Sequence, residues 1–176
     1  MRDWRLPIGL WVAALVFAAA VYVRHGGHAG IPVALRPPRV GAHLPTLTAT
    51  TLGGTDLRIA GLRGHPVWIN FFASWCPPCN AEMPRIVARE RTLRRRGLVV
   101  VGLDQQENPA LVRRFMHLYG IRFPVYIDGG GIAGAFGVNG LPVSVFVDRH
   151  GVIQAIRYGE LDRSEMDGDL AAILGA

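Results

Sequence analysis

The two cysteines of this 176-residue chain, Cys76 and Cys79, lie three positions apart. They fall where an apolar run, residues 66–73, gives way to a segment of helical character, residues 76–96. A disulfide across so short a spacing closes a very small loop, so it stabilises little through chain entropy. A thiol at the start of a helix gains reactivity, because the helix N-terminus stabilises its thiolate. The pair therefore suits reversible thiol–disulfide exchange better than a structural role.

In such an exchange Cys76 attacks a partner disulfide, and Cys79, one turn later on the same helix face, resolves the mixed disulfide. Trp75 shields one side and offers a contact surface. The alternatives are half of a zinc site or a merely structural pair. Structural zinc needs four ligands, no second C-x-x-C follows, and His25 and His28 lack an acidic or thiol neighbour. We expect no metal, and no cofactor other than the redox-active Cys76–Cys79 disulfide.

Strands and helices must alternate around the dithiol to position it. A β-hairpin with a Gly53-Gly54 turn is predicted within residues 40–64. The strands that follow are predicted at 66–73, 98–103, 123–127, 143–148 and 152–158, and the helices at 76–96, 109–119, 132–136 and 162–174. The first strands alternate with helices and should pair in parallel, whereas the last two form an antiparallel hairpin. Residues 40–176 are thus predicted to be an α/β sandwich around a mixed sheet.

The N-terminus predicts a membrane attachment. After a short tail, residues 1–5, an apolar run covers 6–23, close to the shortest length that spans a bilayer. We interpret it as an uncleaved transmembrane signal anchor because the run continues to Val23; a signal peptide cut after the alanines at 18–20 is the alternative. Residues 24–39, rich in Gly, Pro and Arg, form a flexible linker. The charge bias is weakly N-terminus-in, which places the domain outside the cytoplasm at the cell membrane.

The formal net charge of +6 reflects 19 basic residues that are all arginines, several of them within residues 89–96. Cationic chains can bind nucleic acid or anionic membranes. No recognition motif or basic–aromatic platform accompanies these arginines. We interpret them as a solvated helix end that the helix dipole favours, and expect no nucleic-acid binding.

The motifs at residues 67–84 (VWINFFASWCPPCNAEMP) and 136–151 (FGVNGLPVSVFVDRHG) resemble the thioredoxin superfamily. The end of the hairpin, residues 62–66, also matches. The likeness is to the membrane-anchored extracytoplasmic branch of TlpA, ResA and CcmG (DsbE) type thiol–disulfide oxidoreductases, with a thioredoxin-like (redoxin) domain. It extends over roughly residues 38–174. The resemblance is specific for the fold and the thiol chemistry, and less so for the substrate.

The resemblance implies that Pro142 is a cis-proline facing the disulfide, with its neighbour Leu141 beside the bound substrate chain. The substrate surface would comprise Trp75, Pro77, Pro78, Leu141 and Pro142. The alternative is a proline that merely opens an edge strand.

Glu82 matches a glutamate that this branch carries three residues after its second cysteine. Such a carboxylate can move a thiol proton if burial raises its pKa; the alternative is a solvated acid favoured in the first helical turn. Asn70 stands where cytoplasmic thioredoxins carry a buried aspartate. Because Asn cannot titrate, proton handling falls to Glu82 or to water.

We expect a membrane-tethered enzyme that reduces disulfides in exported proteins such as apocytochrome c during cytochrome c biogenesis, with electrons from a membrane donor of CcdA or DsbD type. Pro77 and Pro78 remove two amide donors near the Cys76 sulfur, which favours a reductant. One alternative is a peroxiredoxin-like peroxidase, but that chemistry requires a threonine at the position of Ala73. The other is a Sco-like copper carrier, but that type uses C-x-x-x-C, one residue longer than the spacing here.

Overall fold

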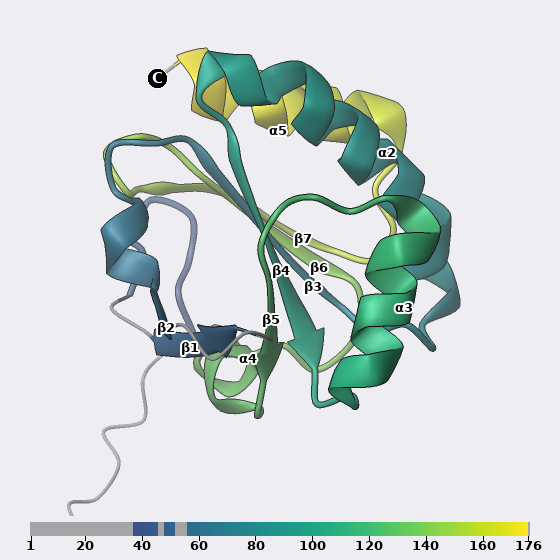
Figure 1. The fold of residues 1–176 in the computed structure, drawn as a ribbon. Coiled ribbons are helices and arrows are strands. Elements are labelled where there is room, and N and C mark those ends of the chain that lie inside the picture. Colours follow the sequence, from purple (N-terminus) through teal and green to yellow (C-terminus); the bar gives the residue numbers. More distant parts are fainter. Residues whose placement is uncertain (1–36, 46–47, 52–55, 176) are drawn as a thin grey trace, which may run out of the picture. The chain divides into compact units, whose positions relative to one another are not determined.

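A mixed seven-stranded β-sheet carries the helices of this chain, with strand order β2-β1-β5-β4-β3-β6-β7 (Figure 1). The computed structural model describes residues 37–45, 48–51 and 56–175. The strands are β1 (Thr48–Thr51), β2 (Asp56–Arg58), β3 (Val67–Phe72), β4 (Val99–Gln105), β5 (Val125–Asp128), β6 (Val143–Val147) and β7 (Ile153–Tyr158). The helices are α2 (Pro77–Leu93), α3 (Pro109–Tyr119), α4 (Gly131–Phe136) and α5 (Arg163–Gly175), with 3₁₀ turns η1 (Ile59–Leu62) and η2 (Arg94–Arg96).

The strand directions confirm the predicted mixed sheet. Strands β3, β4 and β5 pair in parallel, and β6 and β7 form the antiparallel hairpin. Two pairings were not predicted: β6 runs antiparallel to β3, and β1 runs antiparallel to β5. Strands β3, β4 and β5 follow one another across the sheet. The helices that connect them, α2 and α3, pack into the same hydrophobic cluster on one face, as the usual right-handed crossovers require.

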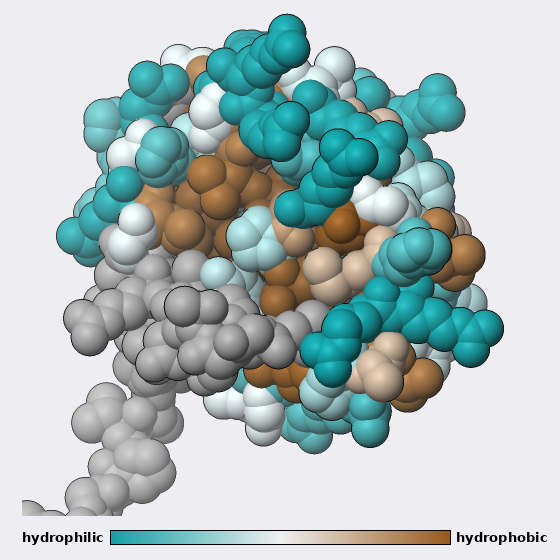
Figure 2. All heavy atoms as spheres, in the orientation of Figure 1, coloured by the Kyte–Doolittle hydropathy of each residue, from teal (hydrophilic) through white to brown (hydrophobic). Residues whose placement is uncertain are grey.

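Two hydrophobic clusters cover the two faces of the sheet. Along β3 successive side chains alternate, so Trp68 and Phe72 join the cluster that contains α2, α3 and α5, while Ile69 and Phe71 join the cluster under α4. Every residue of β3 is buried, as a strand covered on both faces requires. On the side seen in Figure 2, hydrophilic side chains gather over α2 and α5 at the top of the view, and an area of hydrophobic residues is visible below these two helices.

The helix ends follow the sequence signals. Asn108 caps α3 by accepting from Ala110 N at 2.8 Å, and Gly120 ends that helix at φ 64°. Asp162 opens α5 in a reciprocal capping box with Glu165. Helix α2 continues through Pro84 and is followed by η2, after which Gly97 adopts φ 88°. The predicted helix over 76–96 is therefore one α-helix with a tighter last turn.

Several predictions about the N-terminal part lie outside the described residues: the segments 1–5 and 6–23, most of the linker 24–39, and the Gly53-Gly54 turn. The hairpin strands themselves are confirmed, since β1 and β2 pair antiparallel. Among the helices that the structure describes, none combines the length and the apolar character needed to cross a bilayer.

Two glycines give a test of packing around the central sheet. A methyl group added at Gly102 on β4 would lie 3.0 Å from Phe72 Cε1 and 3.1 Å from Val125 Cγ2, both on buried side chains. We expect Gly102→Ala to lower the free energy of unfolding by about 1–3 kcal/mol. The matched change Gly134→Ala, in α4 with open space around it, should raise it by about 0.5–1 kcal/mol. Urea unfolding of both variants checks this; equal effects would contradict it.

Candidate active site

The dithiol lies at the junction of β3 and α2, as a disulfide between Cys76 and Cys79 whose Cα atoms are 5.3 Å apart. Cys76 is the N-cap residue of α2, in extended conformation, and its Sγ accepts a hydrogen bond from Cys79 N at 3.2 Å. Pro77 and Pro78 occupy the first two helical positions and have no N–H to offer. The amide of Cys79 is thus the first in the helix that can stabilise negative charge on the Cys76 sulfur.

The two sulfurs differ in access. Cys76 lines a cavity of about 440 Å³, whereas Cys79 is fully buried and does not line it. The cavity wall is formed by Trp75, Cys76, Pro77, Pro78, Gln105, Val138, Asn139, Gly140 and Leu141. Trp75, for which the sequence predicts a contact surface, is 67% exposed beside it. Gln105 and the 138–140 loop were not predicted as part of this surface.

The peptide bond between Leu141 and Pro142 is cis, as the resemblance implied. Pro142 directly precedes β6, whose first residue Val143 pairs with Phe71 near the end of β3. The buried proline therefore lies next to the strand end from which the dithiol follows. Leu141 reaches the cavity wall, whereas Pro142 itself does not line it.

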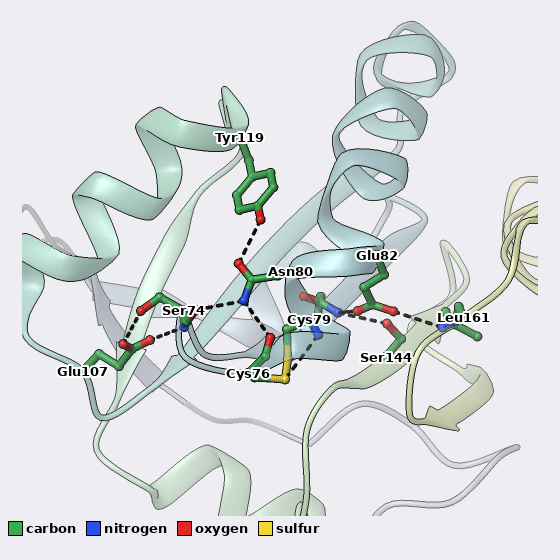
Figure 3. The surroundings of a disulfide bond; sticks show 10 residues. Ser74, Cys76, Cys79, Asn80, Glu82, Glu107, Tyr119, Ser144 and Leu161 are labelled. Carbon is green, nitrogen blue, oxygen red and sulfur yellow. Dashed lines mark hydrogen bonds between the residues drawn. A yellow bond between two sulfur atoms is a disulfide. The ribbon is translucent and has the colours of Figure 1, made fainter.

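Glu82 is buried and bonded on both carboxylate oxygens. Asn70 Nδ2 donates to Oε1 at 2.9 Å, and Leu161 N donates to Oε2 at 3.1 Å (Figure 3). Asn70 Nδ2 also donates to Ser144 Oγ at 3.2 Å, which in turn accepts from Trp68 Nε1 at 2.9 Å. Because side chains alternate along a strand, Trp68 and Asn70 of β3 both point to the sheet face under α2. The register of β3 and β6 places Ser144 opposite Asn70. Sequence reasoning named Asn70 and Glu82 but missed Ser144.

Burial raises the pKa of Glu82 from 4.5 to about 7, although the hydrogen bonds from Leu161 and Asn70 oppose the shift. The carboxyl can therefore gain and lose a proton near neutral pH. The solvated first-turn acid, the alternative left open by the sequence, is wrong because Glu82 has no exposed surface.

A second set of polar residues surrounds the turn before Cys76, and sequence reasoning missed it. Glu107, from the loop between β4 and α3, accepts from Ser74 N and from Ser74 Oγ, both at 2.5 Å. Asn80 Nδ2 donates to the carbonyls of Ser74 and Cys76, at 2.9 and 2.7 Å. The available signal was Asp104, a polar residue at the carboxyl end of a strand parallel to β3, where functional groups of α/β folds gather.

This arrangement can exchange electrons through one accessible sulfur, with a second sulfur behind it and a titratable carboxyl in the core. Fold and site together define a thiol–disulfide oxidoreductase with a thioredoxin-like fold. In the described part of the chain, no group of three or more His, Cys, Asp or Glu side chains is placed to hold a metal ion.

Comparison with known proteins gives the family. Residues 40–156 match the model of the AhpC/TSA family, to which the chain therefore belongs. Its relatives include the thiol–disulfide oxidoreductase ResA of Bacillus thuringiensis strain Al Hakam, 33% identical over 136 residues that cover 77% of this chain and 79% of that protein. The ResA of Halalkalibacterium halodurans is 30% identical over 122 residues, 69% of each chain.

Solved structures agree in fold and chemistry. A thiol:disulfide interchange protein of the thioredoxin family from Chlorobium tepidum TLS superposes with a TM-score of 0.70 at 29% identity, covering 80% of this chain and 100% of that one. A secreted Mycobacterium tuberculosis disulfide oxidoreductase homologous to E. coli DsbE gives 0.66 at 27% identity, covering 72% and 96%. The predicted thioredoxin-like fold and disulfide chemistry are confirmed.

The raised pKa of Glu82 predicts how stability changes with pH. Its folded value, about 7, lies above the ordinary 4.5, so the folded chain holds a proton that the unfolded chain releases. This contribution is complete below pH 4.5 and is lost as pH rises through about 7. Between pH 5 and pH 8, the free energy of unfolding of the oxidised parent protein should fall because Glu82 ionises. We expect this fall to be about 2–3 kcal/mol smaller in the oxidised Glu82→Gln variant.

Urea unfolding of both proteins at several pH values in that range measures the difference. Asp104, whose pKa burial also raises to about 7, titrates in both proteins and cancels. Parallel losses in parent and variant would show that Glu82 is already charged in the folded chain.

Proposed function

We propose that this protein is a membrane-tethered, extracytoplasmic reductase of protein disulfides, with Cys76 as nucleophile and Cys79 as resolving thiol. The observation that supports this most is the single helix amide at the Cys76 sulfur, that of Cys79. Pro77 and Pro78 withhold two further donors. A thiolate with fewer amide donors is less stabilised, so the dithiol form is a better electron donor.

The reaction proceeds through two exchanges. The Cys76 thiolate attacks one sulfur of the substrate disulfide, which forms a mixed disulfide and releases the other substrate sulfur as a thiolate. Cys79 then loses its proton and attacks Cys76 Sγ, which breaks the mixed disulfide and releases the second substrate thiol. The substrate gains two electrons and the Cys76–Cys79 disulfide forms. Access to the cavity supports this order, because Cys76 lines it and Cys79 does not.

Glu82 takes up the proton that Cys79 loses. It follows Cys79 by three residues on α2, it is buried, and its pKa of about 7 suits proton exchange near neutral pH. Asn70, which cannot titrate, holds Glu82 Oε1 in place. The substrate chain lies along Trp75, Pro77, Pro78 and Leu141, which line the cavity beside the accessible sulfur. Pro142, which is buried, supports this surface from behind through its cis bond to Leu141.

Location and partners are part of the same proposal. The apolar run at 6–23 anchors the chain, and the linker 24–39 holds the domain off the outer side of the cell membrane. Substrates are exported proteins that carry disulfides, apocytochrome c among them, and electrons come from a membrane donor of CcdA or DsbD type. The likeness of the motifs at 67–84 and 136–151 to the TlpA, ResA and CcmG branch supports these assignments.

Trapping tests the assignment of the two thiols. In full-length Cys79→Ser the mixed disulfide on Cys76 cannot be resolved, so we expect substrate proteins to accumulate in covalent complexes that reductant releases. The control Cys76→Ser keeps only the buried sulfur and should form none. Diagonal gel electrophoresis followed by mass spectrometry identifies the bound proteins. Equal trapping by the two variants would reverse or remove the assigned roles.

Three assays on the purified full-length protein separate the proposed reaction from its alternatives. We expect insulin disulfides to be reduced, with little turnover of peroxide and no stoichiometric copper. The pKa of the Cys76 thiol, from alkylation rates against pH, should lie far above the value of ~3.5 found in the strong oxidant DsbA. A Cys76 pKa near that value would mean that the protein is an oxidant.

A further inference from the structure

Ser74, two residues before the nucleophile, is bonded from both sides. Glu107 accepts from its amide and its hydroxyl, and Asn80 Nδ2 donates to its carbonyl (Figure 3). Asn80 also donates to the carbonyl of Cys76 at 2.7 Å. Within the same turn, Cys76 N donates to Ala73 O at 3.2 Å. The segment that carries Trp75 and Cys76 is thus fixed by side chains from outside it.

Each of the two outer residues is itself held by a neighbouring element. Glu107 N donates to Asp104 Oδ1 at 3.0 Å, and Asp104 is buried at the end of β4 opposite Phe72. Tyr119 Oη, from α3, donates to Asn80 Oδ1 at 2.9 Å. The structure therefore contains a continuous link from β4 and α3 to the reactive turn.

The pKa values of the two carboxyls, Asp104 and Glu107, fit this arrangement of hydrogen bonds. Burial raises the pKa of Asp104 to about 7, so this carboxyl is mostly protonated only below about pH 7. Burial alone would raise the pKa of Glu107 as well, but the hydrogen bonds with Asp104 and Ser74 outweigh it and lower that pKa. The negative charge thus lies on Glu107, where two donors of Ser74 point at it. Charge-assisted bonds of this kind are stronger than neutral ones.

We propose that Glu107 and Asn80 are positioning residues for disulfide exchange, which act through Ser74 to hold Cys76 Sγ and the Trp75 wall in their reactive placement. Neither side chain needs to touch the substrate. The requirement is steric: the incoming sulfur must meet Cys76 Sγ in line with the bond that breaks, and Trp75 forms part of the cavity that receives the substrate.

The test compares three alanine variants of the full-length protein. Glu107→Ala removes the acceptor for the Ser74 amide and hydroxyl. Asn80→Ala removes the donor to the Ser74 carbonyl. Asp148→Ala is the matched control: Asp148 also accepts from backbone amides, of His150 and Val152, but lies at the far end of β6 from the cis-proline. For each variant we measure the insulin reduction rate, the urea midpoint, and the rate of Cys76 alkylation by iodoacetamide from pH 5 to pH 10.

We expect Glu107→Ala and Asn80→Ala each to lower kcat/KM for insulin by about tenfold or more, since a displacement of about 1 Å can cost on the order of 100-fold. Their alkylation rates at high pH should stay within about twofold of the parent, because a small reagent needs no aligned cavity. Asp148→Ala should lower the urea midpoint and leave kcat/KM unchanged.

Three outcomes would overturn the proposal. If Asp148→Ala loses as much activity, the losses follow stability. If Glu107→Ala and Asn80→Ala both keep full kcat/KM, the hydrogen bonds to Ser74 are structural only. If Glu107→Ala lowers the Cys76 pKa and Asn80→Ala changes nothing, Glu107 acts through its charge on the thiolate. Should Glu107→Ala fail to fold, Glu107→Gln keeps the side chain's shape, and it should still weaken exchange because it retains a single acceptor for two donors.

Discussion

The position of Cys76 between a buried strand and the first turn of a helix is the constraint on which the site depends. Strand β3 is covered on both faces and cannot shift, so the residue that follows it has a fixed place. The partial positive charge at the start of α2 then acts on whatever atom caps the helix, and here that atom is a sulfur. Because prolines fill the next two positions, the stabilisation comes through one amide, and the sequence between the cysteines sets how strongly the thiolate is favoured.

Behind the dithiol, the polar groups of the core depend on the same alternation of side chains along the strands. Asn70 points to the face under α2 because Trp68 and Phe72 do, and this brings it to Glu82. A buried acid is costly when charged, so the folded chain favours the protonated form and the pKa rises to about 7. The same burial that destabilises the carboxylate gives the site a group that exchanges protons near neutral pH.

In front of the dithiol, carboxyls serve a different purpose. Burial raises the pKa of Asp104, whereas hydrogen bonds with Asp104 and with Ser74 lower the pKa of Glu107. Below about pH 7, two acidic residues three positions apart thus differ in charge: Asp104 is mostly protonated and Glu107 is a charged acceptor. In the proposed mechanism, Glu82 on α2 takes up the proton of Cys79, and Glu107 in the loop after β4 holds Ser74 in place.

The sequence by itself determined the dithiol, its place at a strand–helix junction, the alternation of elements and most helix ends, because these follow from local spacing and capping chemistry. The family resemblance carried by the motifs at 67–84 and 136–151 also pointed to Glu82 and to the cis-proline. Only the tertiary structure decided that Ser144 meets Asn70, that β6 runs antiparallel to β3, and that Glu107 and Asn80 hold Ser74. Those contacts join residues far apart in the sequence, such as Asn70 and Ser144 at a separation of 74 positions, or depend on a loop whose course no local pattern encodes, so packing of the whole sheet had to place them.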